Sequence, residues 1–286
     1  MTDQKPVLLI DARNVMYRAI HASKREDRRN GGRRAPFVIM LRMIASLVTR
    51  YQPGMVQIFW DAPRKEVWRR AILETYKNRP DDHGGGDRDI STTLISTQDI
   101  ARQAFEHLNV YQFYLDRQEA DDLIYAACKL QGHRPMVIVS SDSDMQQIPY
   151  SMDSVRIYNH DKGKEMPRPT VSPVLIKALV GDISDCIEGY HGTGPVNAGK
   201  MAASATVLQE YLAIKGDSTL RRNLALIDMS LNPYTLKNIM YVGKVLATKP
   251  SFNKEKLMSL ERSLRISGLS LEYGEIITPF KHLPNE

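Results

Sequence analysis

The sequence predicts an α/β fold built on a mainly parallel sheet, followed by a mostly helical region. Short apolar runs alternate with stretches of helical periodicity through the first half of the chain, which is typical of parallel strands joined by crossover helices. The predicted strands are 7–10, 55–60, 110–115, 136–139 and 155–158. The predicted helices are 36–51, 97–108 and 119–130. We expect the α/β domain to cover residues 1–165.

Prolines mark the predicted boundary between the two parts of the chain. Pro167, Pro169 and Pro173 follow the last predicted strand, and the patterns beyond them are mainly helical. We therefore predict a second, mostly helical domain over residues 166–286, including a helical segment after Ser251. Within the first domain, glycines and turn-forming residues at 81–87 interrupt the pattern, which favours a mobile insertion.

Composition narrows the class of protein. The apolar fraction of 42% over 286 residues is that of an ordinary globular chain, and the formal charge of +6 is compatible with a polyanionic partner. We find no apolar run long enough for a membrane span and no secretory signal at the start, so we expect a cytoplasmic protein. Two cysteines, Cys128 and Cys186, are too few for a disulfide scaffold or a cysteine-based zinc site.

Carboxylates follow the predicted strands at the points where these strands end. Asp11 comes directly after the first strand, Asp61 after the second, and Asp142 and Asp144 after the fourth. In an open α/β sheet, ligands bind outside the carboxyl ends of the strands. We therefore expect these four side chains to converge although they are far apart in sequence.

Two further acidic groups have helical spacing. Glu119 and Asp122 stand three residues apart at the start of a predicted helix and share a face, while Asp121 points elsewhere. Asp182 and Asp185 repeat the same spacing. Any single one of these acids could be a helix cap or a turn residue, but the recurrence at strand ends favours a common site.

Nine carboxylates in one place repel one another unless they take up protons or bind cations. Oxygen ligands without cysteine or histidine favour Mg²⁺ or Mn²⁺. Two such ions about 3.5–4 Å apart can activate water and stabilise the leaving oxygen of a phosphodiester. The residues thus predict metal-dependent hydrolysis of a nucleic-acid backbone without a nucleophilic side chain.

The acidic motifs, in this order, resemble those of the structure-specific 5′ nuclease family, which comprises flap endonucleases and 5′→3′ exonucleases, and particularly its short phage-type members without a polymerase domain. The matching motifs are Leu9-Ile10-Asp11, Phe59-Trp60-Asp61, Glu119-Ala120-Asp121-Asp122, Ser140-Ser141-Asp142-Ser143-Asp144 and Gly181-Asp182-Ile183-Ser184-Asp185. The similarity extends over roughly residues 7 to 205. It implies a PIN-like (Rossmann-like) nuclease domain with a helical arch insertion at about 80–96, and a helix–three-turn–helix-like C-terminal region.

The resemblance also implies roles for individual residues. Asp11, Asp61, Glu119 and Asp121 would surround one metal ion, with Asp122 close to both ions. Asp142, Asp144, Asp182 and Asp185 would serve the second ion or its outer shell. The implied cofactor is two or more Mg²⁺ ions, for which Mn²⁺ can substitute. Asp11, Asp61, Lys77 and Arg79 would be the catalytic residues, the two basic ones stabilising the scissile phosphate from a basic helix at 68–79.

The implied DNA contacts come from two basic stretches and a glycine loop, with solvated surfaces as the alternative reading of the basic stretches. They are Arg33, Arg34, Arg69, Arg70, Tyr76, Gly192, Gly194 and Lys200. Tyr76 could stack on a terminal base, and the glycine loop could grip a duplex phosphate through backbone amides. Three departures from the family pattern stand out: residues 196–199 look like an insertion, Cys186 replaces the usual asparagine, and Lys77 and Arg79 are one residue closer than usual.

Histidines and tryptophans carry less information. His107, His133, His160 and His191 show no ligand spacing, so we expect them on the surface or in loops. Trp60 and Trp68 are expected to pack in the core.

The expected activity is cleavage from the 5′ end of DNA, and of RNA–DNA hybrids, that leaves a 5′-phosphate and removes primers or flaps in replication. The expected partners are duplex DNA with a 5′ flap or 5′ end and a single-strand-binding protein or sliding clamp. We expect a monomer in the cytoplasm, the host cytoplasm if the chain is phage-encoded. Two alternatives stay open: a PIN-type endoribonuclease, which would cut single-stranded RNA, and a catalytically silent DNA-structure-binding protein, which would bind without metal or cleavage.

Overall fold

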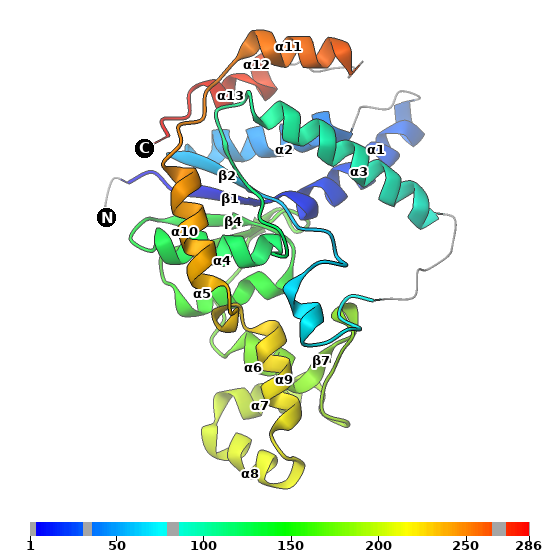
Figure 1. Cartoon of the computed structure of the whole chain (residues 1–286), viewed down its shortest axis with the longest axis vertical. Helices are drawn as coiled ribbons and strands as arrows, with labels where there is room; N and C mark the ends of the chain where they lie inside the picture. The colour runs from blue at the N-terminus through cyan, green and yellow to red at the C-terminus, as the bar shows by residue number, and fades with distance from the viewer. Residues whose placement is uncertain (1–3, 31–35, 79–85, 265–272, 286) are drawn as a thin grey trace.

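The computed structural model describes residues 4–30, 36–78, 86–264 and 273–285. A six-stranded sheet with the order β3-β2-β1-β4-β5-β6 lies at its centre (Figure 1). The strands are β1 (Val7–Asp11), β2 (Met55–Phe59), β3 (Tyr111–Phe113), β4 (Met136–Val139), β5 (Val155–Asn159) and β6 (Lys164–Glu165). The first five run parallel and only β6 is antiparallel, which confirms the predicted mainly parallel sheet.

The strand order reverses at β1. This strand pairs with β2 on one side and with β4 on the other, with Ile10 opposite Ile58 and Val139. A reversal of this kind leaves a crevice at the carboxyl ends of the two central strands, where ligands bind in open α/β sheets. The fold therefore places the acidic residues that follow β1, β2 and β4 at the edge where a site is expected.

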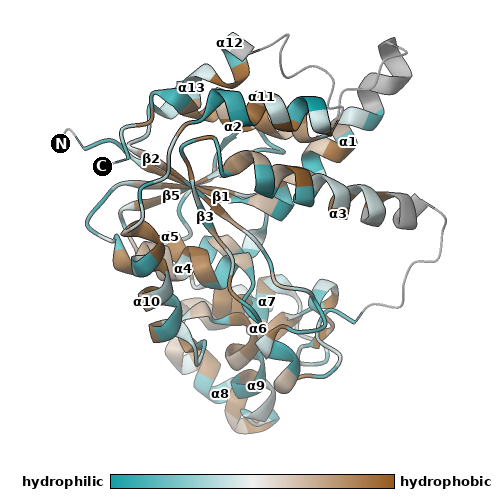
Figure 2. Cartoon of the chain, turned by 45° about the horizontal axis from the view of Figure 1, so that its top comes forward, coloured by the Kyte–Doolittle hydropathy of each residue, from teal (hydrophilic) through white to brown (hydrophobic). Residues whose placement is uncertain are grey.

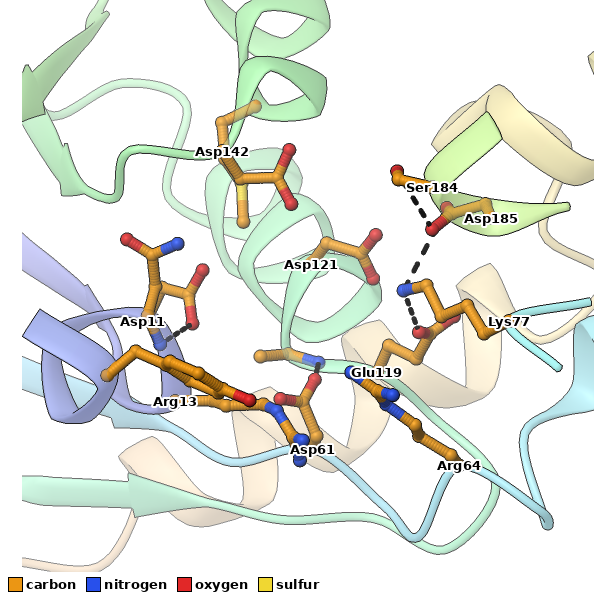
Figure 3. A pocket seen from close by; sticks show the side chains of 14 residues that line it. Asp11, Arg13, Asp61, Arg64, Lys77, Glu119, Asp121, Asp142, Ser184 and Asp185 are labelled. Atoms are coloured by element: carbon orange, nitrogen blue, oxygen red, sulfur yellow. Dashed lines mark hydrogen bonds and ion pairs between the residues drawn. The ribbon is translucent and has the colours of Figure 1, made fainter. Parts of the chain in front are cut away.

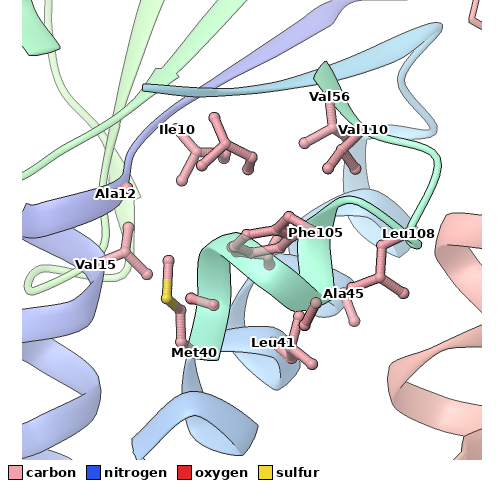
Figure 4. Packing of buried hydrophobic residues seen from close by; sticks show 14 of the residues in the cluster. Ile10, Ala12, Val15, Met40, Leu41, Ala45, Val56, Phe105, Leu108 and Val110 are labelled. Atoms are coloured by element: carbon pink, nitrogen blue, oxygen red, sulfur yellow. The ribbon is translucent and has the colours of Figure 1, made fainter. Parts of the chain in front are cut away.

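One face of the sheet is covered by three helices from the first part of the chain. They are α1 (Ala12–Asn30), α2 (Pro36–Tyr51) and α3 (Gly86–Phe105). Side chains alternate along a strand, so Leu8 and Ile10 point into this layer, where Phe105 packs near Ile10 (Figure 4). Figure 2 shows the hydrophobic colouring concentrated along the central strands.

The opposite face is covered by α4 (Ala120–Leu130), α5 (Gln147–Ser151) and α10 (Thr235–Leu246). The alternate strand residues Val7 and Leu9 point into this second layer. Short 3₁₀ turns lead into or out of the crevice. They are η1 (Trp68–Ala71), η2 (Ser143–Gln146), η3 (Ile183–Asp185) and η4 (Met229–Leu231).

A smaller helical lobe lies below the sheet in Figure 1. It contains α6 (Pro173–Val180), α7 (Pro195–Ala203), α8 (Ala205–Lys215), α9 (Ser218–Ile227) and the hairpin of β7 (Gly181–Asp182) and β8 (Ile187–Glu188). Its core also includes Val67 and Tyr76, which the chain contributes before reaching the lobe. The lobe therefore packs directly against the segment between β2 and α3.

The last part of the chain returns to the α/β layers. The helix α10 packs on α4, while α11 (Lys254–Ser263), α12 (Tyr273–Ile276) and α13 (Thr278–Lys281) lie over the layer of α2 (Figure 1). Ile276, Ile277 and Phe280 are buried in the same core as Leu8. The sequence predicted a separate helical domain over residues 166–286. In the structure the last part of that range packs in the core of the α/β layers instead.

Two segments also differ from the sequence-based expectations. The basic stretch after Asp11, read as a loop or a phosphate-facing segment, forms the helix α1 up to Asn30 because Val15, Met16, Ala19 and Ile20 give it a buried face. The helix α3 begins at Gly86, so it includes residues 86–96 of the expected arch; residues 80–85 lie outside the described residues. Within the described part of the chain, no helix is long and apolar enough to cross a membrane.

Candidate active site

A cavity of about 240 Å³ opens at the carboxyl ends of β1, β2 and β4 (Figure 3). Six carboxylates line it: Asp11, Asp61, Glu119, Asp121, Asp142 and Asp185. In Figure 3 the side chains of Asp121 and Asp142 point into the space between Asp11 and Lys77. The structure therefore brings together acids that lie up to 174 residues apart in the sequence.

The two strand-end aspartates are held by neighbouring donors. Asp11 accepts hydrogen bonds from the backbone N–H of Asn14 at 3.1 Å and from the Ser140 hydroxyl at 2.9 Å. Asp61 accepts one from the backbone N–H of Ala120 at 2.8 Å, at the start of α4. Burial, together with the charges of Asp61 and Asp142, raises the pKa of Asp11 to about 7. A divalent cation in the cavity would relieve this repulsion.

The start of α4 supplies three acids with different surroundings. Glu119 receives hydrogen bonds from Arg69 at 2.6 Å and from Lys77 at 2.5 Å. These partners outweigh burial and lower the pKa of Glu119 to about 2. Burial raises the pKa of Asp121 well above its usual value, since its nearest cation, Arg69, stays 3.8 Å away. Two cationic side chains thus stabilise the ionised carboxylate of Glu119. The carboxylate of Asp121 has only the more distant Arg69 guanidinium to stabilise its charge.

Asp122 points away from the cavity. Its carboxylate accepts hydrogen bonds from Trp68 at 3.0 Å, from Arg69 at 2.9 Å and from the backbone N–H of Glu119 at 3.2 Å. It does not line the cavity, although one of its oxygens lies within 4.8 Å of oxygens of Glu119 and Asp121. Asp122 lies behind the cavity, where it bonds to Arg69, and its predicted role beside the metal ions stays a prediction.

The predicted DNA contacts by Arg69 and Tyr76 are wrong, because both side chains are buried. Arg69 is 2% exposed, pairs with two carboxylates and donates from Nε to the backbone oxygen of Leu226 at 2.8 Å. Tyr76 is also 2% exposed, and its hydroxyl donates to Glu119 at 3.1 Å and Asp185 at 3.3 Å. Neither side chain is available to a phosphate or a base. Arg70 is half-buried, and Arg33, Arg34 and Arg79 lie outside the described residues.

Lys77 enters the cavity from a turn rather than from a continuous basic helix. Only Trp68–Ala71 forms a 3₁₀ helix in this stretch, and Lys77 has a left-handed backbone with φ of 53°. Its backbone N–H donates to the oxygen of Asp185 at 3.0 Å, which ties this turn to the acidic loop of the helical lobe. Its ammonium contacts Glu119 and lies 4.0 Å from Asp185.

A second group of carboxylates lies beside the first. Oxygens of Asp144, Asp182 and Asp185 all lie within 4.8 Å of one another. The ammonium of Lys177, from α6, contacts both Asp144 and Asp182. Sequence reasoning missed Lys177, although it is the one charged residue of the otherwise apolar helix Pro173–Val180 and could have been noticed for that reason.

Four further residues of the cavity wall were not singled out. They are Arg13, Asn14, Tyr17 and Arg64. The amide oxygen of Asn14 accepts hydrogen bonds from Ser141 at 2.8 and 2.9 Å and lies 2.5 Å from Nε2 of His160. His160 is buried, and it lies in the turn after β5, within the expected surface-or-loop placement. Trp60 and Trp68 are buried, which confirms their expected packing role.

The glycine loop lies away from the cavity in the helical lobe. Gly192 has a φ of 79° and Gly194 precedes α7, whose first residue is Pro195. Residues 196–199, which look like an insertion relative to the family pattern, lie in the first turns of α7, and Lys200 is exposed on the same helix. Exposed backbone amides at a helix start suit a phosphate, so the geometry is compatible with the predicted duplex contact.

The donor set fits divalent cations. Both carboxylate groups offer oxygens at close spacing, and the pKa values of Asp11, Asp61, Asp121, Asp144 and Asp185 are all raised, in each case mainly by burial. Such carboxylates are destabilised in the ionised form unless a cation joins them. Chemically, the arrangement can hold metal ions beside a phosphodiester and present Lys77 to it.

Comparisons with known proteins agree with this geometry. Residues 6–174 match a family described as 5′-3′ exonuclease, N-terminal resolvase-like domain. A 5′-3′ exonuclease of Halalkalibacterium halodurans is 27% identical over 266 residues, covering 85% of this chain and 81% of that protein. DNA polymerase I of Bacillus subtilis is 22% identical over 297 residues, covering 96% of this chain and 33% of the polymerase. The chain thus spans about a third of the length of this polymerase relative.

Among solved structures, the chain is similar to the bacteriophage T5 flap endonuclease in a pseudo-enzyme–product complex with DNA and metal ions. The TM-score is 0.62 at 18% identity, covering 91% of this chain and 98% of that one. At this identity the likeness shows that the fold is shared, over both the α/β layers and the helical lobe.

Proposed function

Because the chain belongs to the 5′-3′ exonuclease family, whose N-terminal resolvase-like domain it carries, we propose that it is a metal-dependent, structure-specific 5′ nuclease that hydrolyses phosphodiester bonds in DNA. The observation that supports this most directly is the convergence of Asp11, Asp61, Glu119 and Asp121 on one cavity, with a second carboxylate group beside it. A binding protein without activity would gain nothing from this much negative charge facing a polyanion.

The chemistry divides between the cofactor and the chain. Bound divalent ions, which we propose to be Mg²⁺, supply charge neutralisation and an activated water. Asp11, Asp61 and Asp121 would hold the first ion, Asp144, Asp182 and Asp185 would hold the second, and Asp142 would contribute from the cavity rim. Because all the ligands are carboxylate oxygens, Mn²⁺ can replace Mg²⁺.

The protein's own residues orient the scissile phosphate. The ammonium of Lys77 reaches the cavity between Glu119 and Asp185, where it can donate to a phosphate oxygen as negative charge develops there. Arg13 and Arg64 line the same cavity and add positive charge at its wall. We propose that Arg79, which lies outside the described residues, assists Lys77 at the phosphate.

The substrate we propose is duplex DNA with a 5′ flap or a 5′ end, or an RNA–DNA hybrid, as expected for primer and flap removal. The similar T5 structure holds DNA, and the exposed glycine loop before α7 with Lys200 offers backbone amides and a charge to a duplex phosphate. We also propose that the protein works as a monomer in the cytoplasm, beside a single-strand-binding protein or sliding clamp. The α/β layers of residues 4–165, completed by 229–285, would form the catalytic domain.

Cleavage of end-labelled substrates tests the proposal. A 5′-flap duplex, a blunt duplex and a single-stranded RNA, each labelled at either end, are incubated with Mg²⁺ or with chelator. We expect Mg²⁺-dependent cutting at or near the flap junction, and none by Asp144→Ala, which should still fold and bind the flap DNA. Cutting of single-stranded RNA without regard to a 5′ junction would favour a PIN-type endoribonuclease. Tight binding with intact substrates would indicate a silent DNA-binding protein.

A further inference from the structure

The two carboxylate groups of the site differ in how they are neutralised. In the second group, the ammonium of Lys177 contacts both Asp144 and Asp182, with its side chain 20% exposed. In the first group, and within the described ranges of the chain, Asp11 and Asp61 have no lysine or arginine nitrogen within 4 Å. The Lys177 ammonium therefore offsets part of the negative charge of Asp144 and Asp182, whereas Asp11 and Asp61 have no basic partner of this kind among the described residues. An incoming cation meets no lysine or arginine at Asp11 and Asp61 among the described residues, whereas at Asp144 and Asp182 it must displace the Lys177 ammonium.

We infer that Lys177 is a built-in competitor of the metal at the second carboxylate group, so that an ion binds Asp144 and Asp182 only when the Lys177 ammonium leaves them. This inference rests on the proposed function, because it assumes that the second group is a metal site. It makes Lys177 a positioning residue that sets the order of metal binding, with the first group filled before the second.

Geometry gives the reason for the exclusion. Lys177 contacts Oδ1 of Asp144 and Oδ2 of Asp182, so a divalent ion that joins these two carboxylates would lie close to the ammonium and be strongly repelled by it. Lys177 would therefore have to move away from both carboxylates before an ion binds them. Because Lys177 stands on α6, outside the acidic loop, its side chain can withdraw without unfolding the loop.

Direct measurement of metal binding tests the inference without DNA or turnover. Free Mn²⁺ is titrated against the full chain by electron paramagnetic resonance, for the unaltered protein, Lys177→Met and the control Lys244→Met. Methionine keeps the aliphatic part of the lysine side chain without its charge. Lys244 suits the control because it is exposed on α10, which covers the sheet, whereas Lys177 is on α6 in the helical lobe. We expect two classes of Mn²⁺ site and, in Lys177→Met alone, a Kd of the weaker class lowered by about tenfold or more. An unchanged or raised Kd in Lys177→Met would overturn the inference.

A second readout reports on the lysine itself. Acetylation of Lys177 by a water-soluble ester, followed by mass spectrometry, should rise several-fold at Mn²⁺ concentrations that fill the weaker class, while acetylation of Lys244 stays constant. Constant acetylation of Lys177 would contradict its release. If Lys177→Met does not fold, Lys177→Gln takes its place in the titration.

The outcomes also separate the inference from the proposed function. Two Mn²⁺ classes with the expected Lys177 effect, but no cleavage of any substrate, would support the inference and refute the nuclease. A single Mn²⁺ class in both proteins would refute the inference even if the flap substrate is cut.

Discussion

Replacement of Arg69 by methionine should destabilise the protein more than any exposed arginine substitution. The Arg69 guanidinium is 2% exposed and bonds to Glu119 at 2.6 Å, to Asp122 at 2.9 Å and to the Leu226 backbone oxygen at 2.8 Å. Methionine would leave two buried carboxylates with fewer partners. Removal of one member of a buried ion pair costs about 3–5 kcal/mol.

Urea unfolding followed by circular dichroism measures this cost. With an m-value of about 3 kcal/mol/M, a loss of 3–5 kcal/mol lowers the urea midpoint by about 1–1.7 M. The neighbouring half-buried Arg70 provides the matched control, and Arg70→Met should change the stability by about 0.5 kcal/mol or less. Arg69→Lys keeps the charge but loses the planar fork, so it should fall between the two. If the urea midpoint of Arg69→Met differs from that of the unaltered protein by less than about 0.3 M, which is about the measurement error, the buried ion pairs of Arg69 do not contribute to stability as argued.

Four further outcomes follow from the site. Lys77→Met should lower kcat on the 5′-flap duplex by about 10²–10³, with Lys162→Met as the exposed control; a change below tenfold would argue against a role for Lys77 at the phosphate. Asp11 has a folded pKa of about 7 against a usual 3.8, so the chelated protein binds a proton there more tightly when folded, and its stability should fall as pH rises from about 4 to about 7. Asp11→Asn should reduce this slope in melting temperature, and an unchanged slope would show that Asp11 does not contribute to it. Over the same window Mn²⁺ binding should strengthen, because the proton must leave. Saturating Mn²⁺, at about 100 times its Kd, should stabilise the protein by about 2.7 kcal/mol against chelator in thermal melts, and an unchanged melting temperature would speak against a metal site. Cys186 has a left-handed backbone with φ of 57°, so Cys186→Asn should raise the stability by up to ~1 kcal/mol, whereas a destabilised variant would show that the thiol packs favourably.

The sequence sufficed for the sheet and for the convergence of the acids. Each apolar run followed by Asp11, Asp61 or Asp142 predicts a strand and also the position of an acid at its end. Because a parallel sheet brings its strand ends to one edge, these acids are expected to lie together. Long-range packing decided the rest. Whether an arginine side chain is exposed to DNA or buried in ion pairs depends on residues that are distant in the sequence. Leu226, whose backbone oxygen accepts a hydrogen bond from Arg69, lies 157 positions beyond it.

The local sequence pattern also predicted the wrong direction for two side chains, Tyr76 and Asp122. Tyr76 follows basic residues and could face DNA, but the helical lobe covers it and turns its hydroxyl toward Glu119 and Asp185. Glu119 and Asp122 were expected to share a helix face, but Glu119 is the N-cap of α4 and lines the cavity with Asp121, while Asp122 is directed to Trp68. For Tyr76 the missing information was the position of the helical lobe relative to the sheet.

The return of the chain to the sheet has a consequence for how the protein is made. Ile276, Ile277 and Phe280 close the same core that Leu8 begins, and the side-chain amide of Asn109 donates to the backbone oxygen of Leu283 at 3.1 Å. All nine predicted metal-site acids are translated by residue 185, so the active-site residues emerge from the ribosome before the core beneath them can be sealed. At about 5–20 residues per second, this interval lasts several seconds. During that time the nascent chain exposes an unfinished apolar face, which makes it a candidate client for chaperones.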